Sequence, residues 1–431
     1  MRITTKNIYK FILFLLVVLP IYQDSPFSIF LGSAGYSALM PLSLVFMVVY
    51  VVVNEKVPKN PRLTEWMKLG YYLCGISFSA ILVWWVLGNS LTVVGEFLPI
   101  KAIKVCLQYF SYPSYIALVL VCVRKVGIKY LEKYAYFTLV FLTAICLIER
   151  QQLPYALEAF HFAGTFPYWR VRLLTMESSW TAMIIYVYSF ISVYYGYKNR
   201  KKIVTYSSVV CIGILVAFSD SKTLMVALAI ILVLYTMFSF AHLNKKTQWK
   251  VIIVLFAGTL GAIEWAPTLL QSFQGDIQNY TSVATRGYTA LIGLMIGIVA
   301  PMGVGGAVYL GVFQRALRYF LFLFDKIPIR LNTTEVESLA FAQTDTALTV
   351  KSGILQRNMY WGIFGTAYLV HNFALVSKAL RKNHVKNEIL LRSAFWGAVI
   401  LITCACEFSF EFLLLYSYLV YLNEATIKEK K

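Results

Sequence analysis

The chain has 431 residues, of which 59% are hydrophobic and only 14% are charged. Its apolar residues come in blocks long enough to cross a hydrocarbon core of about 30 Å, so the composition excludes an ordinary soluble domain. We therefore expect an all-α polytopic integral membrane protein, with one integral domain over residues 1–431. The net charge of +19 is attributed to membrane topology and to contact with anionic lipid headgroups, and no nucleic acid is expected as a partner.

The apolar blocks predict about 12 transmembrane helices. The first block lacks an A-x-A cleavage site and is expected to be retained as a span. The last two blocks are short, so residues 393–423 could instead form one long helix. In chain order the expected spans are residues 11–22, 36–53, 69–88, 105–123, 134–148, 179–196, 203–218, 223–240, 251–264, 354–376, 393–409 and 410–423.

Basic residues determine the expected orientation. Alternate loops and the two chain ends hold 26 of the 39 Lys and Arg residues but only 6 of the 20 acidic residues. By the positive-inside rule these segments are cytoplasmic, so both termini are expected in the cytoplasm. The segments counted are residues 1–10, 54–68, 124–133, 197–202, 241–250, 377–392 and 424–431.

Two large segments are expected on the outer face. Residues 288–310 are apolar enough to span, but counting them as a span would place the five basic residues of 377–392 outside. They are therefore expected to form a membrane-associated apolar helix within a large outer loop, residues 265–353. The second outer loop is residues 149–178.

The stretch FPYWRVRLLTMESSW, residues 166–180, gathers charges at the expected start of the sixth span. Arg170 and Arg172 precede this span, and Glu177 is expected in its first turn, where the helix dipole favours an anion. The two serines that follow Glu177 are expected to cap the helix. The alternative is that the arginines extend to lipid headgroups and that the flanking tryptophans belong to an aromatic belt.

More charges are expected at the same level of the membrane. Asp220 and Lys222 lie in a very short outer turn, and Arg286 opens the apolar outer helix. Guanidinium groups bind phosphate oxygens in bidentate fashion and a lysine adds a compact charge, so cations gathered here suit a diphosphate. We predict one outward pocket lined by Arg170, Arg172, Lys222 and Arg286, with Glu177 and Asp220 beside them.

Other candidate residues carry weaker signals. Gly303 and Gly305 lie where the apolar outer helix ends, either as part of a substrate-binding turn or simply as a tight turn. His161 is the one histidine in an outer loop of interest, and it is a candidate for chemistry. The seven cysteines lie in apolar runs and the histidines show no metal spacing, so no metal or cofactor is expected.

The motifs follow one another in a definite order. Arg-x-Arg-x4-Glu-Ser-Ser-Trp occupies 170–180, Ser-Asp-Ser-Lys-Thr occupies 219–223, and Arg286 precedes an apolar helix and the turn Pro-Met-Gly-Val-Gly-Gly at 301–306. Ser-Gly at 352–353 then opens an aromatic-rich span. This order resembles the bacterial O-antigen polymerase and ligase superfamily, and is most similar to Wzy-type polymerases of polysaccharide repeat units, over roughly residues 130–376.

The sequence departs from the family pattern at two points. Ser178 stands where relatives often carry proline, and Lys222-Thr223 stands where they often carry Arg-Ser or Arg-Gly. These departures put the roles of the two segments in doubt, while the order of the motifs remains.

The resemblance implies a fold similar to the C type of membrane glycosyltransferase. It also implies a polymerase of polyprenyl-diphosphate-linked oligosaccharides on the outer face of the bacterial cytoplasmic membrane, for capsule, exopolysaccharide or O-antigen synthesis. Donor and acceptor would both be lipid-linked, and a chain-length regulator and a flippase are candidate partners. Arg286 and Arg170 would stabilise the leaving diphosphate, and Glu177 would orient the acceptor or accept its proton. The implied binding residues are Arg172, Lys222, Asp220, Gly303, Gly305 and His161.

Two other functions remain open at this stage. A flippase or other transporter would need a basic path through the membrane and weak repeat symmetry between halves, and no such symmetry is visible. A ligase that attaches the glycan to another acceptor differs in substrate and not in fold.

Overall fold

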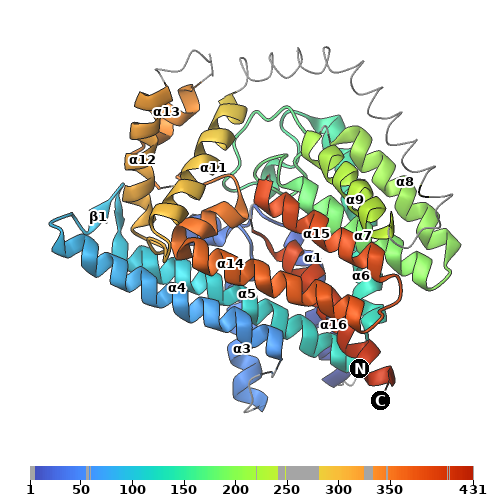
Figure 1. Cartoon of the computed structure of the whole chain (residues 1–431). Helices are drawn as coiled ribbons and strands as arrows, with labels where there is room; N and C mark the ends of the chain where they lie inside the picture. Colours follow the sequence, from blue (N-terminus) through green and yellow to red (C-terminus); the bar gives the residue numbers. More distant parts are fainter. Residues whose placement is uncertain are drawn as a thin grey trace.

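The computed structural model describes residues 5–54, 58, 60–219, 221–240, 248, 281–324, 333–345, 348–404, 406 and 408–430. Within these residues regular structure is almost entirely helical (Figure 1). Two short strands, β1 (Thr92–Val93) and β2 (Glu96–Phe97), pair antiparallel, with Thr92 opposite Phe97. The predicted all-α fold is confirmed, whereas the expected span at 251–264 lies outside the described residues.

The helices correspond closely to the apolar blocks of the sequence. The first part of the chain forms α1 (Thr5–Val18), α2 (Ser28–Leu31), α3 (Leu39–Asn54), α4 (Pro61–Val86), α5 (Leu98–Val126) and α6 (Ile128–Gln152). The middle forms α7 (Thr181–Lys198), α8 (Lys202–Phe218), α9 (Lys222–Phe240), α11 (Thr281–Val299), α12 (Tyr309–Phe324) and α13 (Thr334–Ala340). The last part forms α14 (Gly353–Lys382), α15 (Glu388–Cys404) and α16 (Phe410–Lys430), and three short 3-10 turns, η1 (Leu19–Ile21), η2 (Gly32–Gly35) and η3 (Glu158–Phe160), lie in the loops.

Local chemistry explains several helix ends. Asn60 caps α4 by accepting hydrogen bonds from the backbone N–H groups of Arg62 and Leu63, at 2.7 and 3.3 Å, and Pro61 occupies the first helical position. α5 ends at Val126, and Gly127 follows it with a φ of 99°, which suits a residue without a Cβ. These signals place the connections of the bundle where the sequence changes from apolar to polar.

Four helices among the described residues are long and apolar enough to span a membrane: α4, α5, α6 and Thr223–Phe240 of α9. Of these, α5 is the most enclosed, packed against α1, α3, α4 and α16, while α9 buries little of its surface. A helix that is apolar on all sides and faces outward fits a lipid surround. The chain is thus an all-α protein with the character of a membrane protein, and the full count of 12 spans stays a prediction.

The connections between helices gather at two ends of the bundle. At one end, Gln23 N–H donates to the Leu174 carbonyl at 2.9 Å, and Gly353 N–H donates to the Cys406 carbonyl at 2.9 Å. Lys101 of α5 pairs there with Asp345. All these segments are ones for which the charge rule predicts the outer face, so this end is called the loop end below.

The opposite end joins the segments that the charge rule places in the cytoplasm. Arg124 pairs with Glu424 at 2.7 Å, Asn60 donates to Glu424 at 2.5 Å, and the Asn383 side chain donates to Asn423 at 2.6 Å. The partition of connections between two ends therefore agrees with the basic-residue pattern, while the sidedness itself stays a prediction.

Residues 300–308 separate α11 from α12, so the predicted apolar helix ends at Val299 and is followed by the expected turn at 301–306, and α12 begins only at Tyr309 (Figure 1). In α14, Gly362 has a non-helical φ of 68° and kinks the helix. The turn enters this kink, where Val304 and Gly305 donate N–H groups to the carbonyls of Met359 and Tyr360, at 2.9 and 3.0 Å. The turn is thus fixed to α14 by backbone contacts.

Two boundary expectations need correction or completion. α7 begins at Thr181, so Glu177 lies in the loop before the helix and not in its first turn. Neither Ser178 nor Ser179 caps α7, and hydrogen bonds between the Tyr168 hydroxyl and Ser178 hold Ser178 in the loop.

Residues 393–423 form two helices rather than one long helix. α15 ends at Cys404, and a separate helix, α16, begins at Phe410.

Candidate functional site

A cleft with a volume of about 850 Å³, counted to its open mouth, lies at the loop end of the bundle. It forms where α5, the loop before α7, the start of α12 and the start of α14 meet. The residues that carry its chemistry are Tyr36, Lys101, Gln108, Glu177, Trp180, Lys351, Ser352, Gln356, Arg357 and Tyr360.

Three cationic side chains from two parts of the chain line the cleft. Lys101 comes from the first turn of α5 and is buried beside Asp345. Lys351 directly precedes α14, and Arg357 lies in its second turn. The Arg357 Nη2 donates to the Tyr112 hydroxyl at 2.8 Å, and the guanidinium lies over the rings of Tyr112 and Tyr360. Stacking of this kind fixes the orientation of an arginine fork.

The start of α14 adds a further positive contribution. Ser352 caps the helix by accepting a hydrogen bond from the Leu355 N–H at 3.2 Å, and its hydroxyl donates to the Thr403 carbonyl at 2.5 Å. Gly353 and Gln356 of the first turn also line the cleft. Because the N-terminus of a helix carries a partial positive charge, it acts in the same direction as Lys351 and Arg357 on an anion in the cleft.

Glu177 is the carboxylate that faces this group of cations. Its Oε1 lies 3.3 Å from the Lys351 Nζ, and its Oε2 accepts a hydrogen bond from the Ser179 hydroxyl at 3.3 Å. The side chain keeps 41% of its surface exposed, so it is accessible to a substrate. Of the residues proposed from the sequence as catalytic or binding groups, Glu177 is the one placed in the lining of the cleft.

Arg172 occupies a different place from the one predicted. Its side chain is 1% exposed, with the guanidinium between the rings of Phe166 and Tyr168 at 4.4 and 4.6 Å from the ring centres. Nη1 donates to the Thr165 carbonyl at 3.1 Å. Arg172 therefore stabilises the interior of its own loop, because the alternating aromatic residues close around it.

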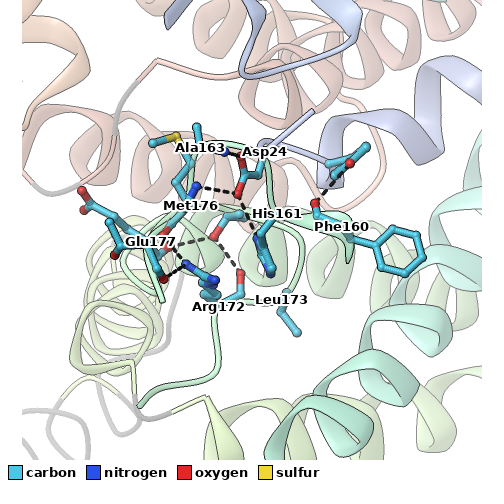
Figure 2. Close-up of polar contacts among 12 residues, drawn as sticks. Asp24, Phe160, His161, Ala163, Arg172, Leu173, Met176 and Glu177 are labelled. Atoms are coloured by element: carbon cyan, nitrogen blue, oxygen red, sulfur yellow. Dashed lines mark hydrogen bonds and ion pairs between the residues drawn. The ribbon is translucent and has the colours of Figure 1, made fainter. Parts of the chain in front are cut away.

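Asp24 and His161 complete this buried group, called the loop core below together with Arg172 (Figure 2). His161 Nδ1 lies 2.9 Å from Asp24 Oδ2, and both side chains are fully buried. Asp24 also accepts N–H groups of Ala163 and Gly164 at 2.7 and 3.1 Å. Burial alone raises the pKa of Asp24, but these hydrogen bonds outweigh burial and hold the pKa below its usual value.

Glu149 fastens the same loop to α6. Its two carboxylate oxygens accept the backbone N–H groups of Arg172 and Leu173 at 2.8 and 2.7 Å. The loop is thus tied to the end of α6 through Glu149 and to the segment after α1 through Asp24. These ties hold the neighbouring residue Glu177 in position at the cleft.

Two of the remaining predicted cations, Arg170 and Arg286, do not line the cleft with Glu177. Arg170 is exposed, and Arg286 is partly buried in the second turn of α11; neither lines the cleft. Asp220 and the side chain of Lys222 lie outside the described residues. Arg172 is enclosed within its own loop and so does not line an outward pocket, whereas the convergence of Arg170, Lys222 and Arg286 stays a prediction.

Gly303 and Gly305 have a role in packing. Their φ values are 91° and 75°, which L side chains rarely adopt. A Cβ on Gly303 would lie 2.3 Å from the Tyr360 carbonyl oxygen, and one on Gly305 would lie 2.6 Å from the Ser77 Cα. Neither residue lines the cleft. This arrangement matches the tight-turn alternative rather than a substrate-binding turn.

Sequence reasoning missed Lys101, Lys351 and Arg357. A signal was available, because a buried ionisable residue in an apolar span is costly and points to a site. Arg357 lies within the expected span 354–376, and Lys101 lies just before the span at 105–123. No group of three or more His, Cys, Asp or Glu residues that could hold a metal is present in the described part of the chain.

Comparisons with known proteins give one distant relative. No family model matches the chain. The sequence is similar to an uncharacterized 49.5 kDa protein in the cps region of Klebsiella pneumoniae, with 27% identity over 147 residues. The match covers 34% of this chain and 33% of the Klebsiella protein, so it spans about a third of either length.

Proposed function

We propose that the protein is a membrane glycosyltransferase that polymerises polyprenyl-diphosphate-linked oligosaccharide repeat units. The observation that carries the proposal is the cleft in which Glu177 faces Lys351 and Arg357 beside the start of α14. Cations and a helix N-terminus suit a diphosphate leaving group, and an accessible carboxylate suits the activation of an attacking hydroxyl. The bundle would then be a variant of the C type of membrane glycosyltransferase.

Each group in the cleft has a role in such a transfer. The oxygen of an acceptor hydroxyl forms a bond to the anomeric carbon of the donor sugar, and the bond from that carbon to the lipid diphosphate breaks. The hydroxyl proton passes to the Glu177 carboxylate. The electron pair leaves with the diphosphate, whose developing charge Lys351, Arg357 and Lys101 stabilise. The product is a glycan longer by the donor chain and a free lipid diphosphate.

The distant relative supports the biological setting. A protein of the cps region belongs to a capsule gene region, so we propose a capsule-related or similar polysaccharide role for this chain. The loop end, with the cleft, would face the outside of the cytoplasmic membrane, where repeat units arrive from a flippase. A regulator of chain length is a further proposed partner.

Deletion of the gene for this protein in the source strain, followed by complementation with native or variant protein, tests the polymerase proposal. Native protein should restore long glycan chains, whereas Glu177→Gln should leave single repeat units on lipid diphosphate at the outer face, with normal amounts of protein in the membrane. Units trapped at the inner face would instead indicate a flippase, and long chains that stay on the lipid without reaching a final acceptor would indicate a ligase. Either result would reject the polymerase.

Sidedness has its own test. In a variant without reactive cysteines, a cysteine at the exposed Thr165 or Gln343 should react with an impermeant reagent in intact cells. A cysteine at Lys202, which is exposed in the expected cytoplasmic connection 197–202, is the matched control and should react only after permeabilisation. The reverse pattern would place the cleft in the cytoplasm and remove the proposed role.

A further inference from the structure

A second compartment, with a volume of about 610 Å³ counted to its open mouth, adjoins the cleft. The two share Tyr36, Gln108, Trp180 and Phe408 as lining residues. The second compartment continues between the first turns of α7 and α16 to Glu411. A ligand that extends from the cleft can therefore reach it without leaving the protein.

The chemistry of the second compartment differs from that of the cleft. Its described lining holds no Lys or Arg, whereas the cleft holds three. In place of cations it presents the amides of Gln23 and Gln108 and the carboxyl group of Glu411. A phosphate is unsuited to this described lining, because no cation there offsets its negative charge.

Glu411 is the most informative residue of this compartment. It is 1% exposed, and its Oε1 accepts a hydrogen bond from the Gln23 amide at 2.7 Å. Its Oε2 and the hydroxyl of Ser409 lie close to each other, but neither makes a hydrogen bond of good geometry among the described residues. Buried polar atoms are normally well paired, so these two groups can form further hydrogen bonds with a ligand at the cavity wall.

Aromatic rings form the other part of the lining. The Trp180 ring is half-buried and lies 6.0 Å from the Tyr36 ring, centre to centre, at an interplanar angle of 51°. The electron-rich face of an aromatic ring attracts the partially positive C–H groups of a sugar ring. Carboxyl, amide and hydroxyl groups beside a tryptophan provide hydrogen bonds for the sugar hydroxyls at the same time.

We propose that the second compartment binds a sugar ring of the acceptor, with Glu411 and Gln23 holding its hydroxyl groups and Trp180 contacting its face. The assignment of this sugar to the acceptor rests on the proposed polymerase function; the presence of a sugar site does not. The cleft would hold the diphosphate and the second compartment the neutral part of the substrate, with Glu177 on the loop that borders both.

Binding to the purified protein in lipid nanodiscs tests this inference with two probes. One is a phosphate-free repeat-unit oligosaccharide released from the polymer of the source strain, and the other is inorganic pyrophosphate. Isothermal titration should show that Glu411→Gln weakens oligosaccharide binding by about tenfold or more and leaves pyrophosphate binding unchanged. Lys351→Ala should show the opposite pattern.

Glu132 offers a matched control. It is likewise a fully buried glutamate, with Oε1 bonded to Tyr418 at 2.8 Å and Oε2 unpaired among the described residues, but it lies at the other end of the bundle. Glu132→Gln should therefore leave the affinity for both probes unchanged. If Glu411→Gln does not fold, Trp180→Ala replaces it, with the same expected loss of oligosaccharide binding.

The outcomes separate this inference from the proposed function. Native affinity for the oligosaccharide in Glu411→Gln, or no binding by the native protein, would overturn the sugar site. Loss of oligosaccharide binding in Glu411→Gln together with no pyrophosphate binding by the native protein would support the sugar site and reject the diphosphate cleft.

Discussion

The loop core and the cleft are neighbouring groups of charged residues with different roles. Asp24, His161 and Arg172 have no access to solvent and are enclosed by aromatic rings and backbone groups. Glu177, five residues after Arg172, is accessible and faces Lys351. A charged residue close to a site in sequence therefore contributes to stability when its own loop encloses it, and can act on a substrate when it borders a cavity.

The largest expected effect comes from Arg172→Ala. Removing the guanidinium takes away its contacts with the rings of Phe166 and Tyr168 and the positive charge near Asp24, and removing one charge from a buried group typically costs about 3–5 kcal/mol. We expect a strongly lowered thermal unfolding temperature in detergent and little protein in the membrane. Lys351→Ala is the matched control, because this cation is partly exposed, and its stability should stay close to native. Equal stability of both variants would show that Arg172 contributes no more to the stability of the fold than Lys351 does.

Lys351→Ala should have its effect on chemistry instead. Loss of one cation that stabilises a leaving group lowers a rate by about 10²-fold. We expect normal protein levels and a strong reduction in long glycan chains, measured on gels of the extracted polymer. Full chain length in this variant would show that the cleft cations do not act on the substrate.

Acid should weaken the loop core selectively through Asp24. Its pKa is lower in the folded protein than the usual value of 3.8, so the folded state binds the proton less readily than the unfolded state. The stabilisation is complete above the usual pKa and is lost as the pH falls through the lowered one. Native protein should therefore be more stable than Asp24→Asn at pH 6, and the gap should narrow below about pH 4.

Thermal unfolding of the two proteins across this pH range checks the expectation. A constant difference between native protein and Asp24→Asn at every pH would show that Asp24 does not titrate in the way its hydrogen bonds imply.

The smallest effect is expected for Arg170→Ala. Its side chain is exposed and does not line the cleft, and such substitutions usually change stability by less than about 0.5 kcal/mol. Unfolding temperature and glycan length should both be close to native. A strong loss of glycan chain length with normal stability would show that Arg170 acts on the substrate, as the sequence motif predicts.

Much of the fold was predictable, and the reason is physical. Hydrophobic blocks and basic loops report the environment of whole segments, so the ranges of α3, α8 and α9 differ from the expected spans by only a few residues. Side-chain direction within a loop depends on contacts that no periodic pattern encodes. Arg170 and Arg172 look alike in sequence, yet the rings of Phe166 and Tyr168 enclose only the second.

The cleft was predictable only in part for the same reason. Glu177 was identified from its position between charges at the start of a span. Lys351 and Arg357 join it because the start of α14 lies beside the junction of α15 and α16, as the contact between Gly353 and Cys406 shows. Such long-range contacts between helix ends are set by packing of the bundle rather than by local sequence.

Chain extension by the purified protein is the decisive measurement of polymerase activity. Lipid-linked single repeat units, extracted from the deletion strain, are placed in proteoliposomes with the native protein alone, and the length of the glycan is followed with time. We predict that native protein converts single units into a ladder of longer chains, and that Glu177→Gln extends single units about 10²-fold more slowly. No ladder with the native protein would reject the polymerase, and the same ladder with Glu177→Gln would reject the role of Glu177.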